Sequence, residues 1–170
     1  GERALQQDQA NTGEHYVATT AQLATVAAAA TAAGRVAIDT EFVWERTFYP
    51  RLGVVQLGID EEQSYVIDTV AVTDLAPLAA LLADPEVEKI LHDPQQDLTL
   101  LRRCSGAYPL HIFDTRRMAG FVGMRCTISF GDLIRELLGI DLPKDERRTD
   151  WLRRPLSAAQ IGYALNDVRY

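Results

Sequence analysis

The chain has 170 residues, of which 47% are hydrophobic and 24% are charged, and these values suit one globular domain with a sizeable core. The formal net charge is −7 and the pI is near 4.9, which argues against a protein that holds nucleic acid by bulk positive charge but not against acidic residues that bind a metal. No apolar run is long enough to span a membrane and no signal peptide is visible, so we expect a cytoplasmic chain without membrane contacts.

The cysteines and histidines form no zinc pattern. Cys104 and Cys126 share no metal-type spacing, and the three histidines are scattered along the chain. Reduced cysteines are the expected state, and a disulfide between them is the alternative. Basic residues cluster locally, in four pairs that lie either on solvated faces or against phosphate: Arg102/Arg103, Arg116/Arg117, Arg147/Arg148 and Arg153/Arg154.

The first predicted elements follow a polar segment without periodicity, which we interpret as a flexible tail over residues 1–15. An alanine-rich helix comes next, with Thr20 as its N-cap and Gly34 in the C′ position. Three strands then follow in close succession, and this order predicts an antiparallel meander. The helix spans Thr20–Ala33, and the strands span Arg35–Phe42, Leu52–Ile59 and Ser64–Asp68.

The second part of the chain alternates helices with short strands. Asp93 is predicted to N-cap a helix that has Pro94 at N1 and Gln96 at N3, which is a capping box. The predicted elements are a helix over Asp74–Leu82, a strand over Glu88–His92, a helix from Asp93 to Arg103, a strand over Leu110–Phe113, a helix capped by Asp114 that runs to Phe121, an amphipathic helix over Ile128–Leu138 and a last helix opened by the capping box Ser157–Gln160.

Between the last two helices, Leu142–Pro155 is polar and lacks helical or strand periodicity. A loop of this length in a compact domain is often functional. Strands that come early in the chain and alternate with helices later predict an α/β fold, in which helices pack around a mixed sheet.

Two carboxylates stand at the end of the first core-like strand, where one residue separates Asp39 from Glu41. Because side chains alternate along a strand, both carboxylates point to the same side and repel each other. A divalent cation would relieve this repulsion, since hard cations take carboxylate oxygens as ligands. A plain surface strand end is the alternative.

Two further acids and one tyrosine are candidates for the same site. Asp97 has no capping role in its predicted helix, and Asp167 lies one turn after Tyr163 in the last helix, so that these two residues share a face. Taken singly, Asp97 and Asp167 also fit solvated helix positions, and Tyr163 also fits a core position.

Together these residues resemble the motifs of the DEDD 3′-5′ exonucleases, in the subgroup whose third motif carries tyrosine, and ribonuclease D in particular. The histidine subgroup places histidine five residues before the last aspartate, where this chain has Gly162. The resemblance covers Tyr16 to Tyr170 through ordered motifs: Ile38-Asp39-Thr40-Glu41-Phe42, Tyr49-Pro50-Arg51-Leu52-Gly53, Val55-Gln56-Leu57, Lys89-Ile90-Leu91-His92 running to Asp97-Leu98, Leu142-Pro143-Lys144, Arg148-Thr149-Asp150-Trp151, Arg154-Pro155-Leu156 and Tyr163-Ala164-Leu165-Asn166-Asp167-Val168.

The resemblance implies a ribonuclease H-like mixed sheet flanked by helices. It implies an exonuclease domain over residues 16–170, which stops before the family's domain does and has no HRDC domain. The implied activity is 3′→5′ hydrolysis of RNA to 5′-nucleoside monophosphates, on single-stranded or structured RNA 3′ ends such as those of tRNA precursors. No protein partner is evident. The rival interpretations are an exonuclease that acts on DNA and a catalytically weak scaffold that binds nucleic acid or protein.

The resemblance also implies the roles of the site residues. The catalytic set would be Asp39, Glu41, Asp97, Tyr163 and Asp167. The four carboxylates would bind two Mg²⁺ or Mn²⁺ ions, about 3.5–4 Å apart, and Tyr163 would orient the attacking water.

Three residues are candidates for contacts with the substrate. Phe42, beside the acids, and Trp151, in the late loop, could stack on bases, and Lys144 could reach a phosphate. A role as a core or loop anchor is the alternative for both aromatic residues.

Overall fold

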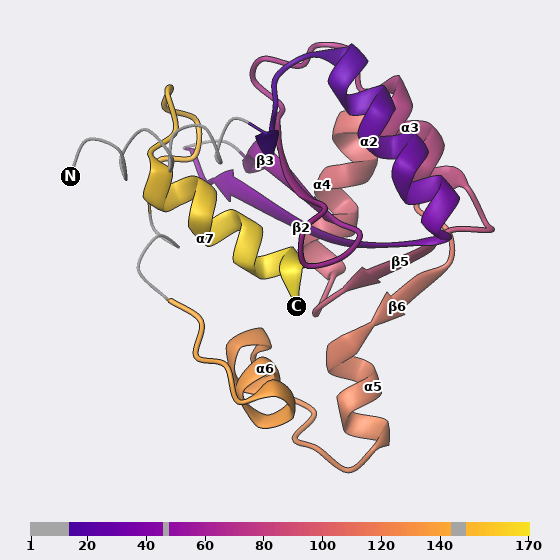
Figure 1. Ribbon diagram of the computed structural model, residues 1–170, viewed down its shortest axis with the longest axis vertical. Coiled ribbons are helices and arrows are strands. Elements are labelled where there is room, and N and C mark those ends of the chain that lie inside the picture. The colour runs from indigo at the N-terminus through magenta and orange to yellow at the C-terminus, as the bar shows by residue number, and fades with distance from the viewer. Residues whose placement is uncertain (1–13, 46–47, 144–148) are drawn as a thin grey trace.

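The computed structural model describes residues 14–45, 48–143 and 149–170 of the chain (Figure 1). One six-stranded sheet organises the molecule, with the strands in the order β1-β4-β3-β2-β5-β6. The strands are β1 (Tyr16–Val17), β2 (Arg35–Val43), β3 (Arg51–Gly58), β4 (Ser64–Asp68), β5 (Glu88–Leu91) and β6 (Ile112–Asp114).

The sheet is mixed, as the sequence predicts. The meander of β2, β3 and β4 is antiparallel, whereas β1 pairs parallel with β4, and β5 pairs parallel with β2 and with β6. The predicted meander is confirmed. Connections without a helix join its strands and let neighbours run antiparallel, whereas the members of each parallel pair are separated along the chain by at least one helix. The two-residue strand β1 was not predicted, since it is too short to carry a pattern.

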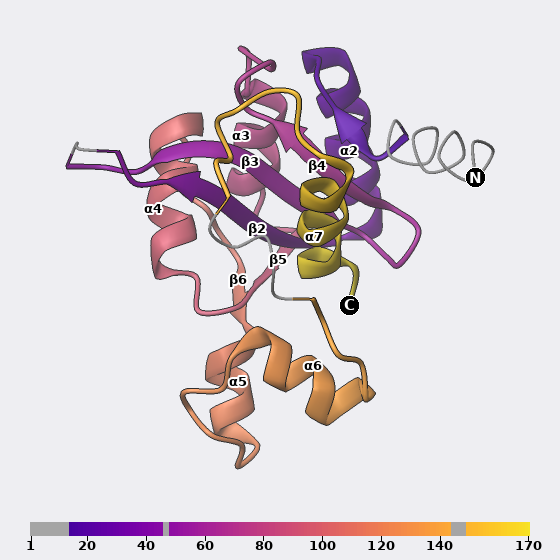
Figure 2. The ribbon, with the colours of Figure 1, turned by 90° about the vertical axis from the view of Figure 1, so that its left-hand side faces the viewer.

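Helices cover both faces of the sheet (Figures 1 and 2). The larger core lies between the sheet and three helices, α2 (Thr20–Ala33), α3 (Ala76–Ala83) and α4 (Gln95–Ser105). The helix α7 (Ala158–Arg169) packs against β2, β3 and β4 on the opposite face, over a second core that includes Val54, Val66 and Ala164. Most of the site described below lies on this second face, and α4 contributes one residue to it.

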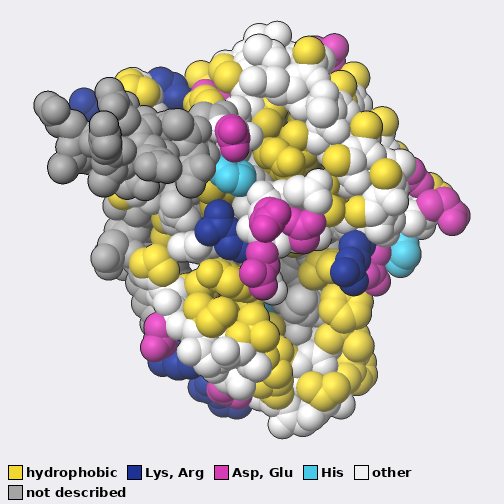
Figure 3. Space-filling view, viewed as in Figure 1, with side chains coloured by type: hydrophobic (Ala, Val, Ile, Leu, Met, Phe, Trp, Pro, Cys, Tyr) yellow, Lys and Arg dark blue, Asp and Glu magenta, His cyan; other side chains and the backbone are white. Residues whose placement is uncertain are grey.

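Two more helices, α5 (Thr115–Phe121) and α6 (Phe130–Leu138), lie beyond the β6 edge and enclose a small core of Ala119, Ile128 and Leu133. Hydrophobic side chains remain on the surface over these helices (Figure 3), among them Phe121, Leu137 and Leu138.

The predicted ends of the helices are confirmed at some positions and wrong at others. The Ser157 capping box and the Gly34 C-cap are present, the latter with a φ of 72°. Thr19, and not Thr20, caps α2 and forms a capping box with Gln22.

The predicted N-cap at Asp93 is wrong. Asp93 has a φ of 52°, and Pro94 occupies the N-cap position without a side-chain cap. The Asp93 carboxylate instead pairs with Arg116, and its N–H donates to Asp114 Oδ1 at 3.1 Å. These contacts tie the start of α4 to α5.

Most other predicted boundaries are shifted by one or two residues, and two of these shifts have a clear local cause. Helix α6 begins at Phe130, because the Ser129 hydroxyl accepts from the N–H of Asp132 and sets the N-cap there. Strand β6 begins at Ile112, because His111 has a left-handed φ of 55°.

The cysteines, the helix lengths and the N-terminal segment can also be compared with what the sequence predicts. Cys104 and Cys126 are free thiols, half-buried and exposed respectively. In the described part of the chain, every helix is too short or too polar to cross a bilayer. Residues 1–13 of the predicted tail lie outside the described residues, whereas His15 contacts the carbonyl of Ser64.

Candidate active site

Strand β2 presents its two acids on the α7 face of the sheet. Val36 and Ile38 belong to the larger core on the opposite face, and Thr40 is buried on that side as well. Because side chains alternate along a strand, Asp39 and Glu41 point the other way, toward α7. The local pattern of apolar and acidic residues therefore fixes which face carries the charge.

Two glycines of β3 allow the C-terminal segment to lie directly on the sheet. A Cβ atom at Gly58 would lie 2.0 Å from the carbonyl oxygen of Val168, and one at Gly53 would lie 2.4 Å from that of Trp151. Only a residue without a side chain permits these approaches. The close approach at Gly58 brings Asp167, the neighbour of Val168, to the acids of β2.

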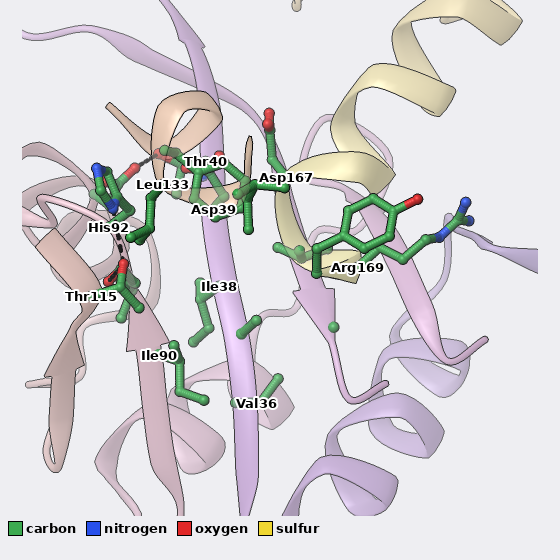
Figure 4. A pocket seen from close by; sticks show the side chains of 18 of the residues that line it. Val36, Ile38, Asp39, Thr40, Ile90, His92, Thr115, Leu133, Asp167 and Arg169 are labelled. Atoms are coloured by element: carbon green, nitrogen blue, oxygen red, sulfur yellow. Dashed lines mark hydrogen bonds between the residues drawn. The ribbon is translucent and has the colours of Figure 1, made fainter. Parts of the chain in front are cut away.

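Three carboxylates form a cluster between β2 and α7. Asp39, Glu41 and Asp167 each offer an oxygen, and these oxygens all lie within 4.8 Å of one another. In Figure 4, Asp39 and Thr40 on β2 and Asp167 on α7 lie together at one end of the pocket, and Ile38, Val36 and Ile90 lie toward the other end.

The cluster strongly disfavours ionisation of Asp39. Burial raises the pKa of the Asp39 carboxyl well above its ordinary range, and the charges of Asp167, Asp97 and Glu41 raise it further. The N–H of Thr40 donates to Asp39 Oδ1 at 2.8 Å and opposes this shift only in part. A set of hard oxygen donors whose charges repel one another fits a divalent cation, which would offset the repulsion.

Asp97 lines the same cleft from the first turn of α4. Its carboxylate accepts a hydrogen bond from the Thr40 hydroxyl, which reaches across from β2. Burial raises the Asp97 pKa, and the hydrogen bond from Thr40 lowers it, with a net upward shift. All four predicted acids therefore line one cleft, and three of them form the close cluster.

Tyr163 also lines the cleft, from one turn before Asp167 on α7. Its side chain is buried, and its ring centroid lies 6.1 Å from that of Trp151. This packing fixes the tyrosine ring relative to the carboxylates.

The cleft has a volume of about 700 Å³ and combines the acids with an apolar wall. Ile90, Leu133 and Leu137 belong to that wall, and Phe42 borders the acids. Such a volume and such a mixed lining suit a ligand of nucleotide size.

The three residues proposed for substrate contacts differ in their position. Phe42 is half-buried and borders the cleft, so a base can reach it. For Trp151 the alternative of a core role is confirmed and the base contact is not, because its side chain is fully buried in the core beneath α7 and offers no face to a base. Lys144 lies outside the described residues.

Arg154 was not predicted to have a structural role. Its guanidinium makes a two-point pair with Asp68, at 2.7 and 2.9 Å, and donates to the carbonyls of Trp151 at 2.7 Å and Gly53 at 2.9 Å. The Tyr16 hydroxyl donates to the same carboxylate. Arg154 thus anchors the segment before α7 to β3 and β4.

Thr40 and Gln56 are the other residues that sequence reasoning missed. Thr40 lies between the two acids of the motif and binds a third, but a threonine in a strand gives no signal of such a role. Gln56 lies opposite Asp39 in the register of β2 and β3, is fully buried, and has an amide without a hydrogen-bond partner among the described residues. A single polar residue in an apolar strand is the signal that could have singled it out.

Comparisons with known proteins agree with this geometry. The sequence model of the family described as 3′-5′ exonuclease matches residues 15–170. Ribonuclease D of Desulfotalea psychrophila is 48% identical over 157 residues, which are 92% of this chain and 42% of that protein. The chain thus spans about two fifths of the length of that curated relative.

Solved structures are similar as well. The crystal structure of Escherichia coli RNase D, described as an exoribonuclease involved in structured RNA processing, matches with a TM-score of 0.85 and 40% identity, over 90% of this chain and 40% of that one. The structure of Brucella melitensis NrnC with bound Mg²⁺ matches with a TM-score of 0.65 and 29% identity, over 79% of this chain and 66% of that one. Because the family model matches residues 15–170 and both the sequence and the fold are similar to those of these relatives, the chain belongs to the 3′-5′ exonuclease family.

Proposed function

We propose that this chain is a metal-dependent 3′-5′ exoribonuclease domain that removes 5′-nucleoside monophosphates from RNA 3′ ends. The observation that carries the proposal is the convergence of Asp39, Glu41 and Asp167, with oxygens within 4.8 Å of one another, in a chain of this family. The relative from Escherichia coli acts in structured RNA processing. We therefore propose structured RNA 3′ ends, such as those of tRNA precursors, as the substrate.

The carboxylates are proposed to hold divalent ions. Asp39, Glu41 and Asp167 would bind directly, and Asp97 would complete the set while its hydrogen bond to Thr40 fixes its orientation. When bound, two Mg²⁺ or Mn²⁺ ions would lower the pKa of a water nucleophile and stabilise the leaving oxygen. The Mg²⁺ in the structure of the Brucella relative, at 29% identity, supports this assignment.

The other residues of the cleft position the reacting groups. Tyr163 is proposed to hold the attacking water by a hydrogen bond, from a ring fixed against Trp151. Phe42 is proposed to pack against the terminal base, because it borders the carboxylates. The apolar wall excludes water from the terminal nucleotide and so strengthens the electrostatic interactions around the phosphate.

The test uses one labelled RNA oligonucleotide in several forms. With Mg²⁺ or Mn²⁺, the 3′-hydroxyl form should be shortened stepwise to mononucleotides, whereas EDTA should stop the reaction. The 3′-phosphate form and a circular form should resist, because an exonuclease needs a free 3′ end. Rapid cutting of the circle would show an endonuclease, and preference for a DNA oligonucleotide of the same sequence would contradict the assignment to RNA.

A further inference from the structure

Four large aromatic side chains near the β2–β3 connection and the end of α4 are exposed. Trp44 is 61% exposed, Phe48 96%, Tyr49 56% and Tyr108 62%. Side chains this exposed contribute little to the core, since most of their apolar area stays in water. Figure 2 shows the described parts of the β2–β3 connection extending past α4.

Two arginines from the last turn of α4 lie over two of these rings. The guanidinium carbon of Arg103 is 3.6 Å from the ring centroid of Tyr49, and that of Arg102 is 3.8 Å from the ring centroid of Tyr108. Cations over ring faces join the β2–β3 connection to α4 and to the segment after it. We name the group Trp44, Phe48, Tyr49, Arg102, Arg103 and Tyr108 the aromatic–arginine surface.

The aromatic–arginine surface carries positive charge in a chain whose net charge is −7. Both Arg102 and Arg103 are exposed, and neither makes an ion pair with an acid in the part of the chain that the structure describes. Nearby, Arg51 is paired with Glu45 at 3.1 Å. Cations beside exposed rings are the combination that binds single-stranded nucleic acid, since arginines contact phosphates and rings stack on bases.

The surface is continuous with the active-site cleft along two elements. On β2, the ring of Phe42 borders the cleft and lies 6.4 Å from the ring of Trp44 in an edge-on arrangement. On α4, Asp97 lies in the first turn and Arg103 in the last. Six helical residues span about 9 Å, which corresponds to two or three stacked nucleotides at about 3.4 Å each.

We propose that the aromatic–arginine surface binds the single-stranded RNA segment just upstream of the 3′-terminal nucleotide. Bases of this segment stack on Trp44 and Phe48, and its phosphates contact Arg102 and Arg103. This proposal rests on the proposed function, because it places the terminal nucleotide in the cleft. It adds the residues that let a chain with a net negative charge retain an oligonucleotide between successive cleavages.

The first test compares substrates of two lengths. A 15-nucleotide RNA reaches the surface, whereas a dinucleotide is too short to cover it. The ratio of kcat/KM for the long substrate to that for the dinucleotide should fall at least about fivefold in Trp44→Ala and Phe48→Ala, which is the lower end for the loss of one base stack. Phe121→Ala is the matched control, since Phe121 is 77% exposed on α5 and lies outside the surface.

The second test measures binding without hydrolysis. The chain has two tryptophans, of which Trp151 is fully buried, so RNA that stacks on Trp44 should quench the exposed fraction of the fluorescence in EDTA. Arg103→Ala should reduce the slope of log K against log salt by about 0.7, the value for one phosphate contact on a single strand. Arg117→Ala, an exposed arginine on α5, should leave that slope unchanged.

The outcomes separate this proposal from the proposed function. If the chain shortens RNA but Trp44→Ala and Phe48→Ala keep the parent ratio, and RNA does not quench Trp44, the surface does not bind RNA and the inference is overturned. If the parent degrades neither substrate, the proposed function fails, and the fluorescence and salt measurements still decide whether the surface binds single strands. Thermal denaturation of each variant confirms that the fold is retained.

Discussion

At the scale of the residue, the site places like charges close together in a half-buried position. Asp39 has three carboxylates around it and receives one backbone hydrogen bond, so its charged form is unfavourable without a cation. The arrangement serves ion binding at the expense of the stability of the metal-free fold. Removal of one charge should therefore have opposite effects on stability and on activity.

We predict that Asp39→Asn abolishes most of the nuclease activity but stabilises the metal-free protein. The pKa of Asp39 is raised on folding, so the free energy of unfolding decreases as the pH rises from the ordinary carboxyl range through the raised pKa. At pH 7 the asparagine variant should be more stable in EDTA by about 0.5–2 kcal/mol, and the gain should shrink at pH 5. Urea denaturation at both pH values measures it, and a variant less stable than the parent at pH 7 would contradict the electrostatic account.

Tyr163 and Asp167 share one helix face, but we assign them different roles. Tyr163→Phe should slow hydrolysis by about 10²–10⁴-fold, the range for a lost acid–base or orienting group, and should leave metal affinity nearly unchanged. Asp167→Asn should weaken metal binding as well as the rate. Calorimetric titration with Mn²⁺, combined with turnover on a short RNA, separates the two. Equal loss of metal binding in both variants would show that the tyrosine is a ligand or a structural residue.

At the scale of the element, the position of α7 on the sheet decides whether the site exists. The helix carries Tyr163 and Asp167, and it approaches β3 most closely where Gly58 meets the carbonyl of Val168. The loop before the helix is held by Arg154, which binds Asp68 and two carbonyls. The geometry of the carboxylates thus depends on contacts made by residues that carry no catalytic group.

We predict that Gly58→Ala displaces α7 and disables the site. The added methyl group would lie 2.0 Å from the carbonyl oxygen of Val168, so the helix must shift, at a cost of about 1–3 kcal/mol for overpacking. Because Asp167 moves with the helix, Mn²⁺ affinity measured by calorimetry should fall together with stability.

Gly162→Ala is the matched control for this prediction. Gly162 is exposed on α7 and has open space around it, so alanine should be neutral or stabilise the helix by up to about 1 kcal/mol. Equal metal affinity in the Gly58→Ala variant and the parent would show that the position of α7 is not what places Asp167.

Much of the fold follows from local signals in the sequence. The meander was predictable because three apolar strands follow one another without an intervening helix, and α7 was predictable from its capping box at Ser157. The same rules failed at Asp93, whose side chain pairs with Arg116, a residue 23 positions later. A capping pattern reports only on contacts between residues close in sequence. Here the ion pair between Asp93 and Arg116 takes the place of the expected cap.

In the candidate site, too, some features follow from the sequence and others depend on tertiary contacts. Residue type and spacing alone left alternatives for the acids of β2 and the Tyr163–Asp167 pair, and the resemblance to a family singled these residues out. The sequence could not decide between a core role and a base contact for Trp151, since its burial results from the close approach at Gly53 and the packing beneath α7. Likewise, the sequence did not distinguish Arg154 from the other arginine pairs, because its partner Asp68 lies far away in the chain and only the fold brings the two together.

At the scale of the whole molecule, one buried network joins three distant parts of the chain. Tyr16 on β1, Asp68 on β4 and Arg154 before α7 meet at a single carboxylate, which is almost fully buried. Burial raises the pKa of Asp68, but the hydrogen bonds from Arg154 and Tyr16 outweigh it and leave the pKa below its ordinary value. Burial and the Asp68 hydrogen bond raise the pKa of Tyr16 to about 12.

We predict that this network makes the stability of the fold depend on pH at both extremes. The depressed pKa of Asp68 means that its contribution is complete above 3.8 and is lost as the pH falls through the lowered pKa. The raised pKa of Tyr16 means that its contribution is complete below 10.0 and is lost as the pH rises toward about 12. Urea denaturation across this range should show a plateau between the two limits.

The variant Asp68→Asn tests the acid limit. It leaves the Arg154 charge without its partner and should cost about 3–5 kcal/mol at pH 7, the range for breaking a buried ion pair. The cost should shrink as the pH falls below 3.8, because the unfolded parent then binds a proton that the folded parent takes up only at its lowered pKa. A cost that stayed constant down to pH 3 would mean that Asp68 acts through its shape alone.

The order of the site along the chain has a consequence for synthesis. Asp39 and Glu41 are made early, whereas Tyr163 and Asp167 are made more than 120 residues later, on a helix that must dock on β3 before the oxygens converge. A nascent chain on the ribosome therefore lacks the complete carboxylate cluster until α7 has left the exit tunnel. During that interval the nascent chain lacks the site proposed to hydrolyse RNA, although RNA surrounds it on the ribosome.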